Sequence, residues 1–331
     1  MFNTRHRPLL LRLGDRPGFT PIRIFLVLGT ITGALSFYFD SPLISPLTGV
    51  YAISICIYLT SKHQRVFEKL QPLLDIDEEQ YQQHKACLTQ YNSVAIVSAA
   101  ALVIPVFFIV NWNSGNYRGI LAGDIAPRLA DVWAISIALL SWACILQNMV
   151  IIFSNMLRFN RLAKHNSRVN LMDIKALVPF TQVGISTILL FSGPYSLFPW
   201  TIYDSIDLLV PLLISAAIVT PVAVAYLLLP LLGVRNRIRK VKRREIELVS
   251  QALKGNRDAL KDTLLANEAN TISTANLTLY KNKIEHVTEW PFDNSALVRI
   301  FSYVIVPVIA WVGDIATEQA IEEFLNYFQT V

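Results

Sequence analysis

Four polar side chains follow one another at helical spacing inside an otherwise apolar stretch of the chain. They are Ser141, Cys144, Asn148 and Asn155, and Gln147 lies beside them. Because residues three, four and seven apart share one face of an α-helix, these four residues form a polar stripe. In a membrane helix such a stripe either donates hydrogen bonds to a neighbouring helix or lines a pore or ligand cavity. The sequence leaves both interpretations open.

Side chains that commonly carry catalysis or bind cofactors fall elsewhere. The six long apolar stretches of the chain contain no Asp, Glu, Lys, Arg or His. The histidines all fall in polar segments, where we expect them to be solvated: His6, His63, His84, His165 and His286. The cysteines, Cys56, Cys87 and Cys144, lack the spacing of a zinc site or a disulfide framework. Without a phosphate-binding glycine loop or a zinc-peptidase pattern, we expect neither an enzyme nor a cofactor or metal.

The composition is that of a membrane protein. The chain has 331 residues, of which 53% are hydrophobic and only 16% are charged, whereas soluble domains have about 25% charged residues. The charges crowd between apolar runs, as they do in multi-spanning helical proteins. The net charge of +5 therefore favours lipid contact and membrane orientation over nucleic acid.

Six apolar stretches are predicted to cross the membrane. They cover residues 24–39, 43–60, 94–110, 132–153, 176–192 and 208–232. The flanking segments 1–21, 61–92, 154–175 and 233–295 hold 4, 4, 5 and 12 basic residues, whereas 40–42, 111–131 and 193–207 hold 0, 2 and 0. Because basic loops stay on the cytoplasmic side, this alternation predicts a multi-pass protein of the inner cell membrane with a cytoplasmic N-terminus.

The strongest orientation signal follows the sixth stretch. Seven basic residues occupy ten consecutive positions there: Arg235, Arg237, Arg239, Lys240, Lys242, Arg243 and Arg244. We interpret them as topology-setting residues that hold this end of the stretch in the cytoplasm.

Two local patterns make further predictions. Gly29 and Gly33 form a GxxxG pair, which lets a second helix approach closely. Asp75 and Glu78 have the spacing of a capping box, so a short helix is expected to begin there.

Residues 233–291 are predicted to form a cytoplasmic helical pair. Apolar stripes run through both halves, and Gly255-Asn256 separates them. Four stripe residues, Val249, Leu253, Leu277 and Ile284, define a candidate assembly surface. The stripes need a partner, which is each other, another copy of the chain or a second protein.

The last segment, 292–331, combines a short hydrophobic helix with an amphipathic acidic tail. Its apolar run, Ile300–Gly313, is about fourteen residues long, which is short for a span. Both a seventh span and a re-entrant or interfacial helix are consistent with it. The fold class expected for the whole chain is all-α: a polytopic helical membrane protein with six spans, this seventh or re-entrant segment and a cytoplasmic helical hairpin.

The C-terminal part resembles a set of uncharacterised bacterial multi-spanning membrane proteins. The similarity rests on GVRNRIRKVKRREIE, on YKNKIEHVTEWPFDNSALVRI with its Trp-Pro-Phe-Asp turn, and on the proline-interrupted SYVIVPVIAW. It covers about the last hundred residues and implies a bacterial inner-membrane protein without implying an activity. Two function classes remain: a sensor, scaffold or effector subunit that acts through its cytoplasmic helices, and an oligomeric channel lined by uncharged polar residues.

Overall fold

The structure is a computed structural model that describes residues 5–14, 19–41, 43–113, 118–124, 126–190, 209–266, 272–291 and residue 298. The predicted segment Ile300–Gly313 and the loop 193–207 lie outside these residues. Within them the chain is all-α, apart from one two-stranded pair. The elements are β1 Arg5–His6, α1 Leu9–Leu13, α2 Pro21–Tyr38, α3 Ile44–Leu70, η1 Gln71–Leu73, α4 Glu78–Cys87, β2 Tyr91–Asn92, α5 Ser93–Ala101, α6 Val103–Asn113, α7 Arg118–Leu121, α8 Leu129–Asn166, η2 Ile174–Leu177, α9 Val178–Thr187, α11 Leu209–Leu253, η4 Arg257–Asp262 and α12 Thr274–Glu285.

Three of these helices are long and apolar enough to cross a membrane. The qualifying segments are Pro21–Tyr38 (α2), Leu129–Asn166 (α8) and Pro221–Leu253 within α11. The third predicted span is a shorter apolar stretch, Ser93–Ile109, split between α5 and α6. Pro105 explains the split, since it has no N–H to donate to the carbonyl of Ala101, where α5 ends.

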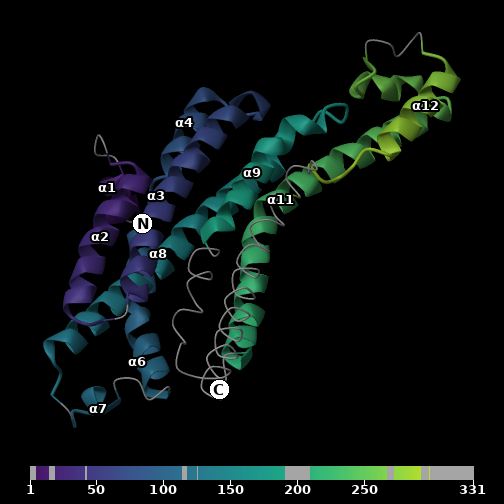
Figure 1. The fold of residues 1–331 in the computed structure, drawn as a ribbon. Helices are drawn as coiled ribbons and strands as arrows, with labels where there is room; N and C mark the ends of the chain where they lie inside the picture. Colours follow the sequence, from purple (N-terminus) through teal and green to yellow (C-terminus); the bar gives the residue numbers. More distant parts are fainter. Residues whose placement is uncertain are drawn as a thin grey trace, which may run out of the picture.

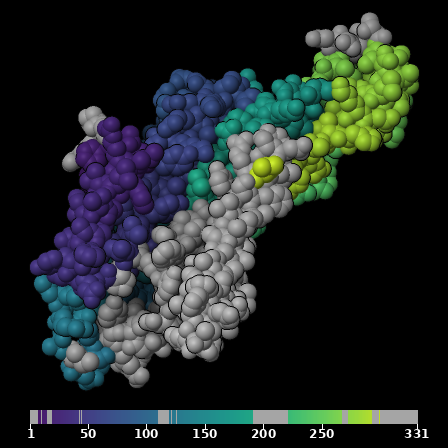
Figure 2. Space-filling model, in the orientation of Figure 1, coloured from purple at the N-terminus to yellow at the C-terminus, as the bar shows by residue number. Residues whose placement is uncertain are grey.

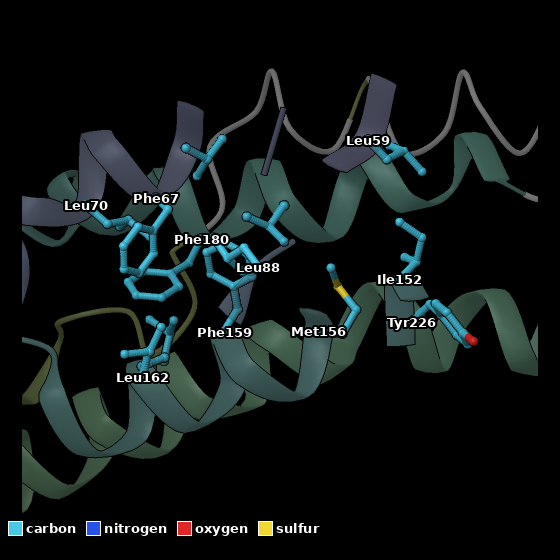
Figure 3. Close-up of a cluster of buried hydrophobic side chains, with 14 of the residues drawn as sticks. Leu59, Phe67, Leu70, Leu88, Ile152, Met156, Phe159, Leu162, Phe180 and Tyr226 are labelled. Carbon is cyan, nitrogen blue, oxygen red and sulfur yellow. The ribbon is translucent and has the colours of Figure 1, made fainter. Parts of the chain in front are cut away.

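The core lies where α3, α8, α9 and α11 meet. Figure 3 shows Phe67, Phe159 and Phe180, from α3, α8 and α9, pointing toward one another. The ring of Phe159 lies 6.4 Å from that of Phe67 and 6.5 Å from that of Phe180, edge to face in both pairs. All three side chains are completely buried. This aromatic cluster ties together helices that are far apart in sequence.

Helix α11 is the longest element, with 45 residues. At 1.5 Å per residue it extends about 68 Å, and Figure 1 shows it running from the lower part of the molecule to α12. The expected boundary between residues 232 and 233 therefore falls inside one continuous helix. Gly233 allows α11 to pass close to α8, because a Cβ there would overlap the carbonyl oxygen of Asn160.

The far end of α11 folds back on itself through η4 and α12. Gly255, with φ of 108°, terminates the helix as the sequence predicted, and the Ser273 side chain caps α12 by accepting from the Asn276 N–H at 3.2 Å. Val249, Leu260 and Leu277 are among the residues of a small separate core. We call residues 245–285 the lobe; in Figure 2 its green and yellow part projects from the rest of the molecule.

Two loops that are far apart in sequence join beside the core. The Asp75 N–H donates to the Asn166 carbonyl at 2.6 Å, and the Arg168 N–H donates to the Leu73 carbonyl at 2.7 Å. The Arg168 guanidinium also pairs with the Asp75 carboxylate at 2.7 Å. A short helix does follow, but Asp77 occupies its N-cap position. The expected capping box is thus wrong in its details, because Asp75 pairs with Arg168 instead.

Candidate functional site

The polar stripe of α8 faces α3. Ser141 Oγ donates to the Ser45 carbonyl at 2.6 Å, and Asn148 Nδ2 donates to the Ala52 carbonyl. Both bonds join residues 96 positions apart, so α3 and α8 run parallel with a constant register. Gly49 makes this approach feasible, because a Cβ there would overlap the Ser141 hydroxyl.

One stripe residue belongs to a polar network at the end of this interface. Asn155 Oδ1 accepts from Tyr91 Oη at 3.1 Å and from Arg158 Nη1 at 3.2 Å. The Arg158 guanidinium lies 5.0 Å from the centre of the Tyr91 ring, and it donates to the carbonyls of Cys87 and Gln90. Arg158 thus fastens the segment before α5 to α8, a role that its position in a basic loop did not signal.

The stripe is closed to solvent. Relative exposures are 3% for Ser141, 5% for Cys144 and 0% for both Asn148 and Asn155. Some of its hydrogen-bonding capacity is unused among the described residues, at Asn148 Oδ1 and Asn155 Nδ2. Since the engaged groups bond to neighbouring elements, the arrangement favours helix packing over pore lining.

The expectation that every histidine is solvated is wrong for His63. Its side chain is fully buried on α3, 5.8 Å from the Phe159 ring. Neither ring nitrogen has a hydrogen-bond partner among the described residues. Burial, with a smaller contribution from Lys62, lowers the pKa of His63 from 6.5 to about 3. The imidazole is therefore neutral at physiological pH. His63 is buried because α3 continues through the segment that the sequence assigned to a polar loop.

The seven basic residues after the sixth apolar stretch separate into two groups. Three are half-buried and bind within the chain. Arg235 pairs with Glu289 at 3.6 Å and lies 4.7 Å from the Trp290 ring centre. Arg237 Nε donates to the Ser167 carbonyl at 3.2 Å. Lys242 donates to two carbonyls at the end of α12, at 2.7 and 2.9 Å.

The second group is exposed. It consists of Arg239, Lys240, Arg243 and Arg244. None of these four side chains has a hydrogen bond or an ion pair to another residue in the described ranges. The sequence does not separate the two groups, because charge alone does not reveal which cations meet a partner.

The candidate assembly residues pack within the chain. Val249, Leu277 and Ile284 are each 1% exposed, and Leu253 is half-buried against the lobe core. Of the three partners that the sequence left open for the apolar stripes, the structure supplies the first, which is each other. Of the four candidate residues, Leu253 is therefore the one whose side chain stays partly exposed.

A buried carboxylate organises the lobe. Glu245 is 6% exposed, and its Oε1 accepts from Tyr280 Oη at 2.7 Å and from the Leu264 N–H at 3.0 Å. Burial, together with the Glu245 carboxylate, raises the pKa of Tyr280, so its hydroxyl stays protonated and donates. This contact joins α11, α12 and the segment after η4.

The Trp-Pro turn anchors the chain after α12. Thr181 Oγ1 donates to the Pro291 carbonyl at 2.9 Å, and Trp290 packs against Ile185, Leu227 and Leu231 among others. These contacts attach the turn to α9 and α11. Across the described ranges, no group of three or more His, Cys, Asp or Glu side chains is placed to hold a metal ion.

Comparison with known proteins gives no relative to reason from. No protein-family model, curated protein or solved structure matches the chain.

Proposed function

We propose that the chain is a multi-pass membrane protein with six spans whose lobe serves as a non-enzymatic sensor, scaffold or effector module. The observation that carries the membrane arrangement is the meeting of three sequence-distant basic segments at one end of the core. Asp75 pairs with Arg168 at 2.7 Å, and Arg237 reaches the Ser167 carbonyl at 3.2 Å. Segments on opposite sides of a bilayer could not make these contacts, so the contacts support placing 61–92, 154–175 and 233–291 on one side.

Contacts at the opposite end support the same arrangement. Trp133 Nε1 donates to Ser36 Oγ at 3.1 Å, and the Trp133 and Phe39 rings lie 5.8 Å apart. These residues flank two of the three segments assigned to the outer side, 40–42 and 111–131. The positive-inside rule then assigns the basic end to the cytoplasm.

The lobe is the working part in this proposal because α11 joins it to the membrane without a break. A helix transmits a displacement at one end to the other more faithfully than a flexible linker does. Among the described residues of the lobe, two large apolar side chains are exposed, Leu264 at 53% and Leu279 at 67%. We propose that a protein partner packs against these two side chains.

A cross-linking experiment on the full chain tests the role of the lobe. A photoreactive residue at Leu279 should give a discrete cross-linked species in cells, and the same probe at exposed Arg65 on α3 is the matched control. Leu264→Ser should abolish that species while leaving the unfolding temperature in detergent unchanged. If Leu279 gives no species beyond those from Arg65, or if Leu264→Ser leaves the Leu279 species unchanged, the lobe does not act through this surface.

A further inference from the structure

Four cations on one face of α11 have no hydrogen bond or ion pair to any residue that the structure describes. Arg239, Lys240, Arg243 and Arg244 occupy positions i, i+1, i+4 and i+5, and all four are exposed. We call them the basic stripe. Together with Asn236 and Glu247 they line a hollow of about 460 Å³. One acid against four cations leaves this hollow strongly positive.

The spacing within the stripe opposes helix stability when the stripe is empty. Arg239 and Arg243 are an i, i+4 pair of like charge, and so are Lys240 and Arg244. Such pairs destabilise a helix, and an anion placed between them removes the repulsion. The three half-buried cations nearby already have partners within the chain, so the stripe is the part of the cluster that is available to a ligand.

A second hollow next to the first is less suited to an anion. It measures about 400 Å³ and shares Lys240 and Arg244 with the first, but Glu245 and Asp262 also line it. The Glu245 carboxylate is occupied by Tyr280 and Leu264, whereas Asp262 is exposed. Asp262 repels an anion from this second hollow, so the side that carries Arg239 and Arg243 is favoured.

Continuity of α11 fixes the distance between the stripe and the apolar run that ends at Leu232. Arg239 and Lys240 lie about 10–12 Å beyond that residue along the axis, and Arg243 and Arg244 about 16–18 Å. Side chains on a helix lean toward its N-terminus by about one turn, which here is the direction of the apolar run. The first pair therefore reaches a headgroup layer that is about 5–8 Å deep. The second pair lies within about one Debye length, roughly 8 Å, of that layer.

We propose that the basic stripe binds the phosphate groups of anionic phospholipids in the leaflet that borders this end of α11. This inference rests on the proposed membrane location. Guanidinium and ammonium groups pair with phosphate oxygens through charge-assisted hydrogen bonds. A soluble phosphate compound presents the same chemistry, and the experiment distinguishes the two sources.

The test uses the full chain in neutral detergent and in phosphatidylcholine nanodiscs with or without phosphatidylglycerol. The stripe variant carries four exchanges: Arg239→Gln, Lys240→Gln, Arg243→Gln and Arg244→Gln. The matched control removes four exposed cations from the other two basic segments: Arg65→Gln, Lys69→Gln, Arg161→Gln and Lys164→Gln. Native mass spectrometry measures the phosphatidylglycerol that each protein retains, and thermal unfolding in neutral detergent checks that each is folded.

We expect the stripe variant to retain at least tenfold less phosphatidylglycerol than the wild type, since each basic residue near an anionic surface strengthens binding about fivefold. The control should retain nearly the wild-type amount. Equal retention by the wild type and the stripe variant overturns the inference, and so does an equal loss in the control. If pyrophosphate raises the unfolding temperature of the wild type but not of the stripe variant, while phosphatidylglycerol does not, a soluble phosphate is the ligand and the lipid assignment is wrong.

A chain that is not embedded in the membrane gives a different result. Alkaline carbonate would extract such a chain from cell membranes, and this is measured before phosphatidylglycerol retention.

Discussion

Substituting Gly49 by alanine tests the parallel contact between α3 and α8. The added Cβ would lie 3.0 Å from Ser141 Cβ and 3.2 Å from Ser141 Cα, and closer still to the hydroxyl. Carbon atoms in packed interiors prefer about 3.5–4.0 Å. The two helices must therefore separate, which costs about 1–3 kcal/mol as other overpacked cores do. Separation also weakens the Ser141–Ser45 bond at 2.6 Å, which adds about 0.6 kcal/mol.

Gly29 supplies the matched control, because a Cβ there meets no atom within 4 Å in the described chain. Gly29→Ala should be neutral or stabilising, by up to about 1 kcal/mol, since alanine favours the helix. A second variant tests the contact itself. Ser141→Gly removes the two closest of these atoms, Cβ and Oγ, so the Gly49→Ala/Ser141→Gly double variant should lose less stability than the two single variants combined, by about 0.5–3 kcal/mol.

Titration with a denaturing surfactant in detergent gives the unfolding midpoints of the wild type and the four variants. If Gly49→Ala is tolerated as well as Gly29→Ala, α3 and α8 do not approach as described. Strict additivity of Gly49→Ala and Ser141→Gly leads to the same conclusion.

Three other variants test the buried groups. Because burial lowers the pKa of His63 from 6.5 to about 3, the unfolded state takes up a proton that the folded state excludes. The free energy of unfolding is therefore retained above pH 6.5 and falls as the pH drops toward 3, by up to about 1.4 kcal/mol per pH unit. In His63→Leu the free energy of unfolding should depend less on pH between pH 7 and 5. The same pH dependence in the wild type and the variant would contradict the burial of His63. Tyr280→Phe removes the donor to Glu245 and should destabilise the lobe by about 1.5–3 kcal/mol. Amide hydrogen exchange should then be faster than in the wild type in α12 and unchanged in α8. Exchange in α12 equal to that of the wild type would show that the bond contributes little. Leu277→Ser should unfold the lobe while the membrane part still inserts, as measured by protease cleavage after Lys254; resistance to cleavage would show that this core is dispensable.

Periodicity in the sequence predicted which residues are helical and which faces are apolar. It located α12 through Leu277 and Ile284, and Gly255 marked the end of α11. It did not reveal what covers each face, because the same apolar stripe suits a second helix of the chain, another copy or lipid. The candidate assembly surface therefore proved to include side chains of the chain's own core.

Glycine and charge patterns had the same limit. The GxxxG pair indicated Gly29, yet close approaches between helices occur at Gly49, Gly184 and Gly233, since contact depends on which helix passes nearby. A capping box was expected at Asp75, but the carboxylate found Arg168, which lies 93 residues away. His63 was assigned to solvent because the helix containing it was expected to stop earlier. Each error concerns a partner distant in sequence, which local spacing does not encode.

Labelling of single cysteines in intact cells tests the proposed topology most directly. Exposed Asn170 and Asn256 report on two of the basic segments, while Ser114 reports on the loop assigned to the outer side. In a background with the native cysteines removed, Ser114→Cys should react with an impermeant maleimide added outside. Asn170→Cys and Asn256→Cys should react only after the cells are opened. External labelling of Asn170→Cys or Asn256→Cys alone would place segments that touch in the structure on opposite sides of the membrane, and would contradict the arrangement.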